Sequence, residues 1–276
     1  MPCTNPFRRL LATALAAVVL PLHAAAEAER SHECLIEPAQ RIEIRSPVTA
    51  LIEQIPVQRG ASVRAGQVLV ELDGTVEAAA LVGARQRAGS DAEFRVAKAR
   101  ADYAREKFRR REELRQQNFI TVQERDEAEA ELRVAEAEQA VAADARRIAA
   151  AEVQRLEALL RQRTLRAPFA GIVTERLQQP GELAFTGEGA RPILRLAQTN
   201  PLRIEAVLPV SLLGRIKAGQ EAEITPEPPL QGRWRARVKV VDRVVDSASG
   251  SFGVRLDLPN ADGERPAGVR CKIRFL

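Results

Sequence analysis

The chain has 276 residues, enough for one or two domains, and a formal net charge of +5. Residues 75–163 carry 18 Lys and Arg against 17 Asp and Glu, so the positive excess is not gathered on this long segment. Because the chain has a single Tyr and a single Trp to stack on bases, the sequence argues against a nucleic-acid partner.

The N-terminus has the pattern of an export signal. Arg8 and Arg9 precede an apolar run over residues 10–22, and small residues follow at 24–26. Since the run is short for a bilayer span, we predict that residues 1–26 are a signal peptide that is cleaved from an exported chain. An uncleaved membrane anchor is the alternative.

Export would leave Cys34 and Cys271 near the two ends of the remaining chain, in an oxidising compartment. They could meet in a disulfide that ties the first strand to the last. Two buried free thiols are the other possibility, and the sequence leaves both open.

Two β-like segments flank a long helical one and repeat each other. A run that begins Arg-Ser-Pro at residue 45 recurs as Arg-Ala-Pro at residue 166, and the spacing from Pro47 to Gly60 equals that from Pro168 to Gly181. Two half-motifs separated by an insert predict one small β-sandwich, built from residues 38–73 and 165–198.

Residues 75–163 predict an antiparallel helical hairpin, because they contain no proline and are rich in strong helix formers. In the second half, apolar residues recur at alternating steps of four and three, which is coiled-coil spacing. That seam consists of Ala128, Leu132, Ala135, Gln139, Ala142, Arg146, Ala149, Val153, Leu156 and Leu160. A weaker pattern predicts the facing seam at Ala78, Val82, Ala92, Val96, Ala99 and Tyr103.

The hairpin is predicted to turn at residues 118–121. Thr121 and Glu124 have the spacing of a capping box, which starts the second helix. The turn would also bring Arg115 and residues 109–111 close to the acidic residues of that helix. Each arm of about 40 residues would reach about 60 Å, which suggests that the hairpin contacts something distant.

From residue 200 to the C-terminus the pattern returns to short alternating strands with glycine-containing turns. We predict a small β-barrel over residues 200–276, with one short helix at 209–217. Residues 33–37 could contribute to this barrel. The predicted fold class is α+β, in which a split sandwich carries the inserted hairpin and a barrel follows.

Catalysis has little support in the sequence. After the predicted signal the one histidine is His32, and no Cys/His cluster has metal-ligand spacing. No nucleophile elbow or phosphate-binding loop is recognisable. We therefore predict no enzymatic activity, no metal site and no cofactor.

The two repeated segments resemble the halves of a biotinyl/lipoyl-like domain, the first at residues 45–47, 60–69 and 72–73 and the second at 165–173 and 180–182. Over residues 38–276 the chain resembles the periplasmic adaptor subunits, or membrane fusion proteins, of bacterial tripartite efflux pumps. True carrier domains present a lysine between their two halves. Neither junction with the helical insert has one, so the resemblance implies no bound lipoyl or biotinyl group.

The resemblance implies a non-enzymatic adaptor that links an inner-membrane efflux transporter of the RND type to an outer-membrane channel and exports small molecules. It also implies self-association into a ring, as a trimer or hexamer. An adaptor of an ABC-type exporter is the alternative, and an envelope coiled-coil tether without a transport role is a third reading. Because the chain stops after the last barrel strand, the membrane-proximal domain of many family members is expected to be absent.

In these adaptors an Arg, a Leu four residues later and a Ser seven residues beyond contact the channel. Arg110, Leu114 and Thr121 have this spacing, with Thr in place of Ser. The resemblance therefore places the channel contact at the hairpin tip, where Phe119 and Ile120 either insert into a partner or fold back on the turn. Arg110 could instead pair with Glu129 of the second helix, and Thr121 could serve only as a cap.

Overall fold

The computed structural model describes residues 31–276, so the predicted signal peptide lies outside the described residues. The chain divides into two compact units. One contains residues up to 39 together with 200–276, and the other contains residues 40–199. Two long strands, β1 (His32–Ile44) and β8 (Leu194–Pro209), continue from one unit into the other. Within residues 31–276 no helix has both the length and the apolar character that a membrane span requires.

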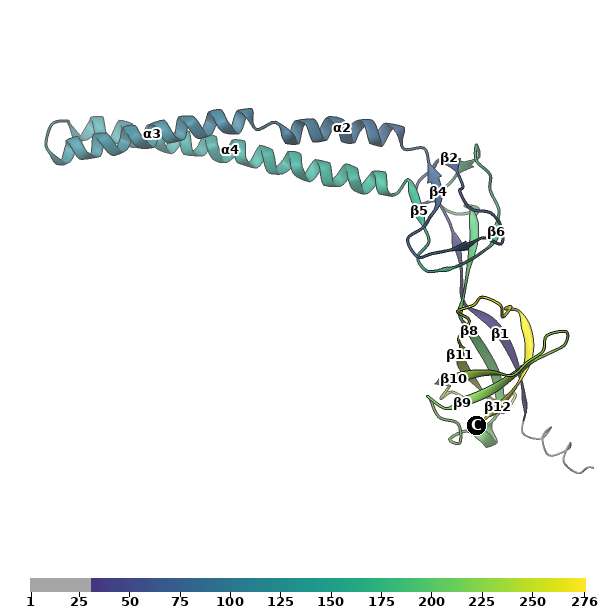
Figure 1. Ribbon diagram of the computed structural model, residues 1–276. Coiled ribbons are helices and arrows are strands. Elements are labelled where there is room, and N and C mark those ends of the chain that lie inside the picture. The colour runs from purple at the N-terminus through teal and green to yellow at the C-terminus, as the bar shows by residue number, and fades with distance from the viewer. Residues whose placement is uncertain (1–30) are drawn as a thin grey trace, which may run out of the picture. The chain divides into compact units, whose positions relative to one another are not determined.

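The predicted helical hairpin is present, but its first arm is two helices rather than one (Figure 1). This arm consists of α2 (Thr75–Gly89) and α3 (Ala92–Gln116), and the second arm is α4 (Val122–Arg161). The arm breaks because Ser90 has an extended backbone, with φ −80° and ψ 114°, directly after the glycine that ends α2.

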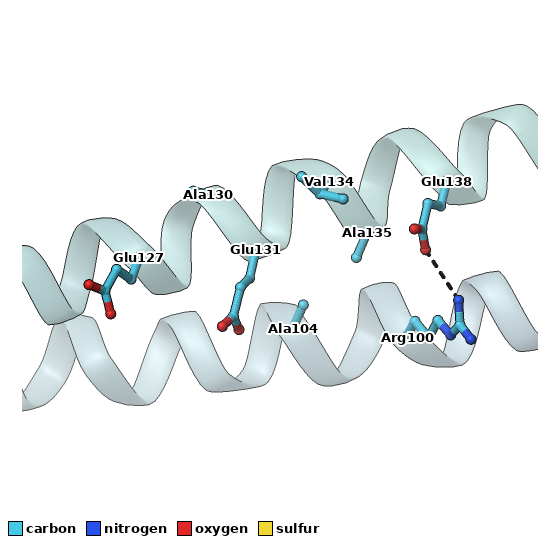
Figure 2. Close-up of a pocket in the computed structure, with 8 residues that line it drawn as sticks. All are labelled: Arg100, Ala104, Glu127, Ala130, Glu131, Val134, Ala135 and Glu138. Atoms are coloured by element: carbon cyan, nitrogen blue, oxygen red, sulfur yellow. Dashed lines mark ion pairs between the residues drawn. The ribbon is translucent and has the colours of Figure 1, made fainter.

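The seam predicted for α4 agrees with the structure, since Ala128, Ala135 and Leu156 are buried. The exception is Arg146, which is exposed and lies over the ring of Phe94, 4.7 Å from its centroid. Across the hairpin, Ala135 of α4 points toward Ala104 of α3 (Figure 2).

The seam predicted for the first arm is wrong. All six of its residues are exposed, and the buried residues of this arm are Leu81, Ala84, Ala97, Ala101 and Ala104. Both sets recur at helical spacing, so periodicity does not separate them. The set that faces α4 between residues 97 and 104 is all alanine, and small side chains let two helices approach closely. The larger Val96 and Tyr103 are left on the outside.

The second unit also contains the β-structure formed by the two repeats. One sheet has the order β5 (Thr164–Arg166), β4 (Val68–Leu72), β2 (Ala50–Gln54) and β7 (Leu183–Ala184). Strands β3 (Ser62–Val63) and β6 (Gly171–Arg176) pair with each other, and β6 also pairs with the first part of β8. The buried core includes Ile52, Leu69, Val70, Val173, Ile193 and Leu194. The hairpin is inserted between β4 and β5, which are adjacent strands.

The two repeats are joined by reciprocal backbone hydrogen bonds. Gly60 N–H donates to the carbonyl of Val173 at 2.8 Å, and its counterpart Gly181 N–H donates to the carbonyl of Ile52 at 2.8 Å. Val173 N–H in turn donates to Ala61, as Ile52 N–H does to Glu182. Because equivalent positions exchange equivalent bonds, neither half is complete without the other.

Gly171→Ala is expected to destabilise this β-unit by about 1–3 kcal/mol, because the added methyl group has no room. A Cβ at Gly171 would lie 2.2 Å from the carbonyl oxygen of Ala197, a backbone atom that cannot rotate away. The free energy of unfolding from urea titrations of the purified chain measures the effect.

The matched control is Gly83→Ala within α2, where a Cβ would meet nothing within 4 Å. This variant is expected to gain about 0.5–1 kcal/mol, because alanine favours a helix interior. Equal stability of the two variants would contradict the close approach of β6 to β8.

The first unit is the predicted β-barrel. Its strands follow the order β1, β12 (Val269–Phe275), β9 (Glu221–Pro226), β10 (Trp234–Val241), β11 (Ser251–Leu258) and β8, and β1 also pairs with β8 to close the barrel. Residues at alternate positions fill the core, among them Leu202, Ile204, Leu208, Ile224, Leu256 and Ile273. The helix predicted at 209–217 is only a 3₁₀ turn over Val210–Leu212, since Gly214 adopts φ +84° two residues later.

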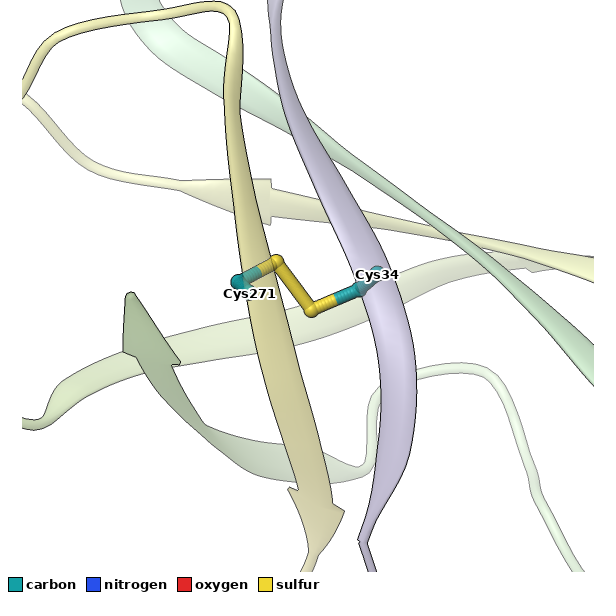
Figure 3. Close-up of a disulfide and its surroundings, with 2 residues drawn as sticks. All are labelled: Cys34 and Cys271. Atoms are coloured by element: carbon teal, nitrogen blue, oxygen red, sulfur yellow. A yellow bond between two sulfur atoms is a disulfide. The ribbon is translucent and has the colours of Figure 1, made fainter. Parts of the chain in front are cut away.

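The barrel holds a disulfide between Cys34 of β1 and Cys271 of β12 (Figure 3). These residues are direct partners in the antiparallel register, and their Cα atoms are 4.8 Å apart. Of the two possibilities that the sequence left open, the structure contains the bridge. It joins neighbouring strands that are 237 residues apart in sequence.

Candidate functional site

The candidate site is the tip of the hairpin, where α3 ends in a Schellman motif. Asn118 has φ 58°, the left-handed conformation that asparagine adopts more readily than most residues. Its N–H donates to the carbonyl of Arg115 at 3.0 Å, and Phe119 N–H donates to the carbonyl of Leu114 at 2.9 Å. The last free carbonyls of α3 are thereby paired, and the chain direction is fixed.

The next helix begins at once with the predicted capping box. Glu124 N–H donates to the Thr121 hydroxyl at 3.2 Å, and Thr121 N–H donates to the Glu124 carboxylate at 2.8 Å. The Thr121 backbone N–H and, next, its hydroxyl lower the pKa of Glu124, with a smaller contribution from Arg111. The cap is confirmed, and the Thr121 side chain is engaged in it.

Between the two motifs the apolar residues face solvent. Phe119 is 73% exposed, and Leu114 is more than a third exposed. Ile120 is half-buried. Because both flanking turns are held by backbone hydrogen bonds, Phe119 is presented outward by a fixed scaffold. Of the alternatives for this ring, folding back on the turn does not occur.

Arg110 does not pair with Glu129 as one alternative held. Its guanidinium lies 3.7 Å from Glu106, one turn earlier on the same helix, and stays exposed. Glu129 is instead bound by Arg125. Similarly, it is Arg111 that approaches Glu124, at 3.7 Å, while Arg115 donates to Asn118.

Arg125 is the residue at the tip that the sequence interpretation missed. It donates to Glu112 of α3 at 2.8 Å and to Asp126 at 3.2 Å, and it also pairs with Glu129. Its guanidinium lies 5.0 Å from the centroid of the Phe108 ring. The neighbouring carboxylates, Glu112 first and Asp126 next, raise the pKa of Arg125, and Arg125 in turn lowers the pKa of Glu112. The signal was present, since Arg125 continues the seam three residues before Ala128.

The tip combines paired charged side chains with exposed apolar ones. Its carboxylates are paired with arginines or with a helix N-terminus, which keeps them charged rather than poised to exchange protons. Within residues 31–276 no three His, Cys, Asp or Glu side chains are grouped to hold a metal ion. What remains exposed is the ring of Phe119 on the doubly capped turn, together with Leu114 and Arg110 on α3, where Arg110 pairs with Glu106 of the same helix.

No family model matches the sequence. The chain is 32% identical over 222 residues to the nickel and cobalt resistance protein CnrB of Cupriavidus metallidurans, an alignment that covers 78% of this chain and 52% of CnrB. It is 28% identical over 240 residues to the multidrug resistance protein MdtA of Escherichia coli, covering 87% of this chain and 52% of MdtA. The chain thus spans about half the length of the curated relatives it matches.

The fold is similar to that of MacA from Actinobacillus actinomycetemcomitans, with a TM-score of 0.72 and 21% identity over 89% of this chain and 78% of MacA. It is also similar to that of the membrane fusion protein Spr0693 of Streptococcus pneumoniae, with a TM-score of 0.61 and 16% identity. That match covers 89% of this chain and 98% of Spr0693.

Proposed function

We propose that the chain is a non-enzymatic periplasmic adaptor of the membrane fusion protein kind, which joins an inner-membrane efflux transporter to an outer-membrane channel. Its similarity to CnrB and MdtA in sequence, and to MacA and Spr0693 in fold, supports this proposal. The observation that carries this proposal is the hairpin tip. A Schellman motif and a capping box hold Phe119 exposed at the end of a charged, otherwise well-paired coiled coil. An apolar ring in such a place favours insertion into a partner.

We assign the channel contact to Arg110, Leu114, Phe119 and Ile120, with Thr121 beside them as the cap. Within residues 31–276 Arg110 pairs only with Glu106 of its own helix, and it can reach a carboxylate or carbonyl of a channel. Leu114 and Phe119 supply the apolar area. The Thr121 hydroxyl already accepts from Glu124 N–H, so its main contribution is to hold the turn in shape.

The β-unit formed by the two repeats corresponds in this proposal to the lipoyl-like domain of the family. Its reciprocal hydrogen bonds and its insertion point between β4 and β5 support that assignment. The barrel would contact the transporter, and the export route would begin there. Copies of the chain would surround that route as a ring.

For the transporter we propose an RND-type pump, with an ABC-type exporter as the alternative. CnrB and MdtA carry resistance in their names, which fits the export of small toxic solutes. Affinity purification of the crosslinked chain, with the captured transporter identified by mass spectrometry, distinguishes the two. A nucleotide-binding subunit in the adduct would favour the ABC exporter.

Photo-crosslinking in living cells tests the adaptor function. A probe at Arg110 is expected to form an adduct with an outer-membrane channel, while a control probe at Arg155, exposed near the base of the hairpin, forms none. Self-adducts alone at Arg110 would favour a coiled-coil tether without a transport role. The variants with the probe at Arg110 and at Arg155 should have the same thermal midpoint of unfolding, since both positions are exposed.

Leu114→Asp is expected to remove the channel adduct at Arg110, by about tenfold or more, because it places a charge in an apolar contact. The thermal midpoint should change little, since Leu114 already faces solvent in part. Val76→Asp, which is exposed at the far end of the hairpin, is the matched control and should keep the adduct. Normal export by Leu114→Asp would contradict the assignment of the tip.

A further inference from the structure

One end of the barrel is formed by loops. β8 and β10 finish at this end and β9 and β11 begin there, so the connections over residues 210–220 and 242–250 lie together. β1 also begins and β12 also finishes at this end, where the C mark stands in Figure 1. We call it the loop end of the barrel.

Backbone hydrogen bonds hold the two loops of this end in place. Val210 N–H donates to the carbonyl of Gly250 at 2.9 Å and joins one loop to the other. Within the loops, Leu213 N–H donates to the carbonyl of Val210 at 2.9 Å, and Gly250 N–H donates to that of Asp246 at 2.8 Å. Because these bonds close the turns, the side chains at their tips are presented on a fixed backbone.

The exposed apolar side chains of the barrel unit gather at the loop end. Val244 is 83% exposed, Val210 48% and Leu213 41%. Val207, just before the end of β8, is 68% exposed. Within the described residues of the barrel unit, the large apolar side chain exposed away from this end is Leu35, which lies farther along β1. Such a gathering is typical of a contact surface.

Three cations stand beside these apolar tips. Arg215 and Lys217 lie in one loop and Arg243 in the other, and all three are exposed. Within residues 31–276 none of the three has an ion pair. The exposed basic residues of β10, by contrast, are paired with carboxylates of the neighbouring strands. The loop end therefore presents positive charge that the described chain does not neutralise.

Two carboxylates in the same loops are engaged locally. Asp246 accepts a hydrogen bond from Ala248 N–H at 2.9 Å, within its own turn. Asp242 packs against the backbone of Gly253 on the barrel wall, where an added Cβ would touch its carboxylate. The cations of the loop end thus remain available to a partner.

This combination fits a lipid surface better than a protein pocket. The tips are aliphatic and stand on separate loops, and leucine and valine are under-represented among the residues that dominate protein interfaces. Aliphatic tips can enter the headgroup layer of a bilayer one by one, while neighbouring arginine and lysine side chains reach lipid phosphates. Each such cation strengthens binding to an anionic surface by about fivefold.

The N-terminal segment joins the barrel at the same end. β1 begins at His32, and residues 27–31 connect it to residues 1–26, which the sequence predicts to be an export signal. An export signal meets the inner membrane while the chain is exported. The end of the barrel that carries the apolar tips and the cations is therefore the end joined to the membrane-directed segment.

We propose that the loop end of the barrel rests on the anionic surface of the inner membrane. Val210, Leu213 and Val244 enter the headgroup layer, and the three cations contact lipid phosphates. This goes beyond the proposed function, in which the barrel meets a transporter, because it gives the barrel a second contact with the lipid around that transporter.

Photo-crosslinking in living cells tests the lipid contact. A photoreactive residue at Val244 is expected to form an adduct with a phospholipid, which mass spectrometry identifies by its headgroup. A control probe at Ala261, exposed in the turn between β11 and β12 at the other end of the barrel, should form none. Adducts with protein alone at Val244 would overturn the proposal and indicate a protein partner. Equal lipid adducts at the two probes would overturn it as well.

Vesicles of phosphatidylethanolamine and phosphatidylglycerol, mixed with the purified full chain, separate the apolar from the ionic contribution. Leu213→Glu is expected to lower the yield of the lipid adduct at Val244 by about tenfold or more, because it places a charge among the tips. Arg215→Glu combined with Lys217→Glu should lower it by about tenfold or more, since two cations are lost. Leu35→Glu, the same change at an exposed position away from this end, is the matched control and should leave the yield unchanged.

The lipid composition gives the last comparison. Replacing phosphatidylglycerol by neutral phosphatidylcholine should lower the yield as the double variant does, because the surface then carries no net charge. An unchanged yield with Leu213→Glu, or equal yields on the two kinds of vesicle, would overturn the proposal. Failure of the adaptor function would show differently, as a missing channel adduct at Arg110 in a chain that still forms the lipid adduct at Val244.

Discussion

Leu156→Asp is expected to destabilise the hairpin by about 3–5 kcal/mol, the sum of a lost apolar side chain and a carboxylate without a partner. Leu156 is 6% exposed and packs against Leu81 and Ala84, the contact that holds α2 to α4. Because the seam elsewhere is mostly alanine, few other side chains could compensate. Thermal unfolding followed by far-ultraviolet circular dichroism measures the loss, since within residues 31–276 nearly all helix lies in the hairpin.

Ala150→Asp serves as the control for Leu156→Asp. It introduces the same charge on the same helix at an exposed position, so its cost should stay near the helix-propensity difference, about 0.7 kcal/mol. Equal thermal midpoints of Leu156→Asp and Ala150→Asp would show that Leu156 does not stabilise the contact between α2 and α4.

Removing the disulfide is expected to destabilise the barrel by about 2–5 kcal/mol, because the bridge restricts the unfolded chain over a very long loop. The double variant Cys34→Ala and Cys271→Ala is preferred to serine substitutions, because both cysteines are buried and serine would leave a hydroxyl in the core. Urea unfolding followed by the fluorescence of Trp234, the single tryptophan, reports the barrel specifically. The helical signal of the hairpin should unfold at the same urea concentration as before.

A reducing agent provides the matched comparison. It should lower the urea midpoint of the unmodified chain and leave that of the double variant unchanged. Equal midpoints of the oxidised and reduced chain, or two titratable thiols in the oxidised chain, would contradict the bridge.

Local sequence determined the elements around which this protein is built. Residues 75–163 form helices because they are rich in strong helix formers and contain no proline. Thr121 and Glu124 start α4 because their side chains reach only the backbone N–H groups next to them. The alternation after residue 200 gives barrel strands because successive side chains of a strand face opposite sides. Each of these depends on residues within a few positions of one another.

Other features depended on partners distant in sequence. The sequence offered two bonding states for Cys34 and Cys271, and the register of β1 with β12 decided between them. The sequence alone allowed Arg110 to pair with Glu129 of the second helix, whereas in the structure it pairs with Glu106 of its own helix. Arg125 lies over the ring of Phe108 and pairs with Glu112 and Glu129. The packing of the two arms determines this position.

The clearest case is the choice between the two stripes of α3. Val96 and Tyr103 repeat as regularly as Ala97, Ala101 and Ala104. Periodicity alone therefore predicts either face of α3 equally well as the one that packs against α4. Only the facing surface of α4 discriminates, because its alanine-rich seam admits a close neighbour with small side chains and would be forced apart by a tyrosine. Sequence therefore determined that α3 has two faces able to pack, and the shape of the partner helix decided which one is buried.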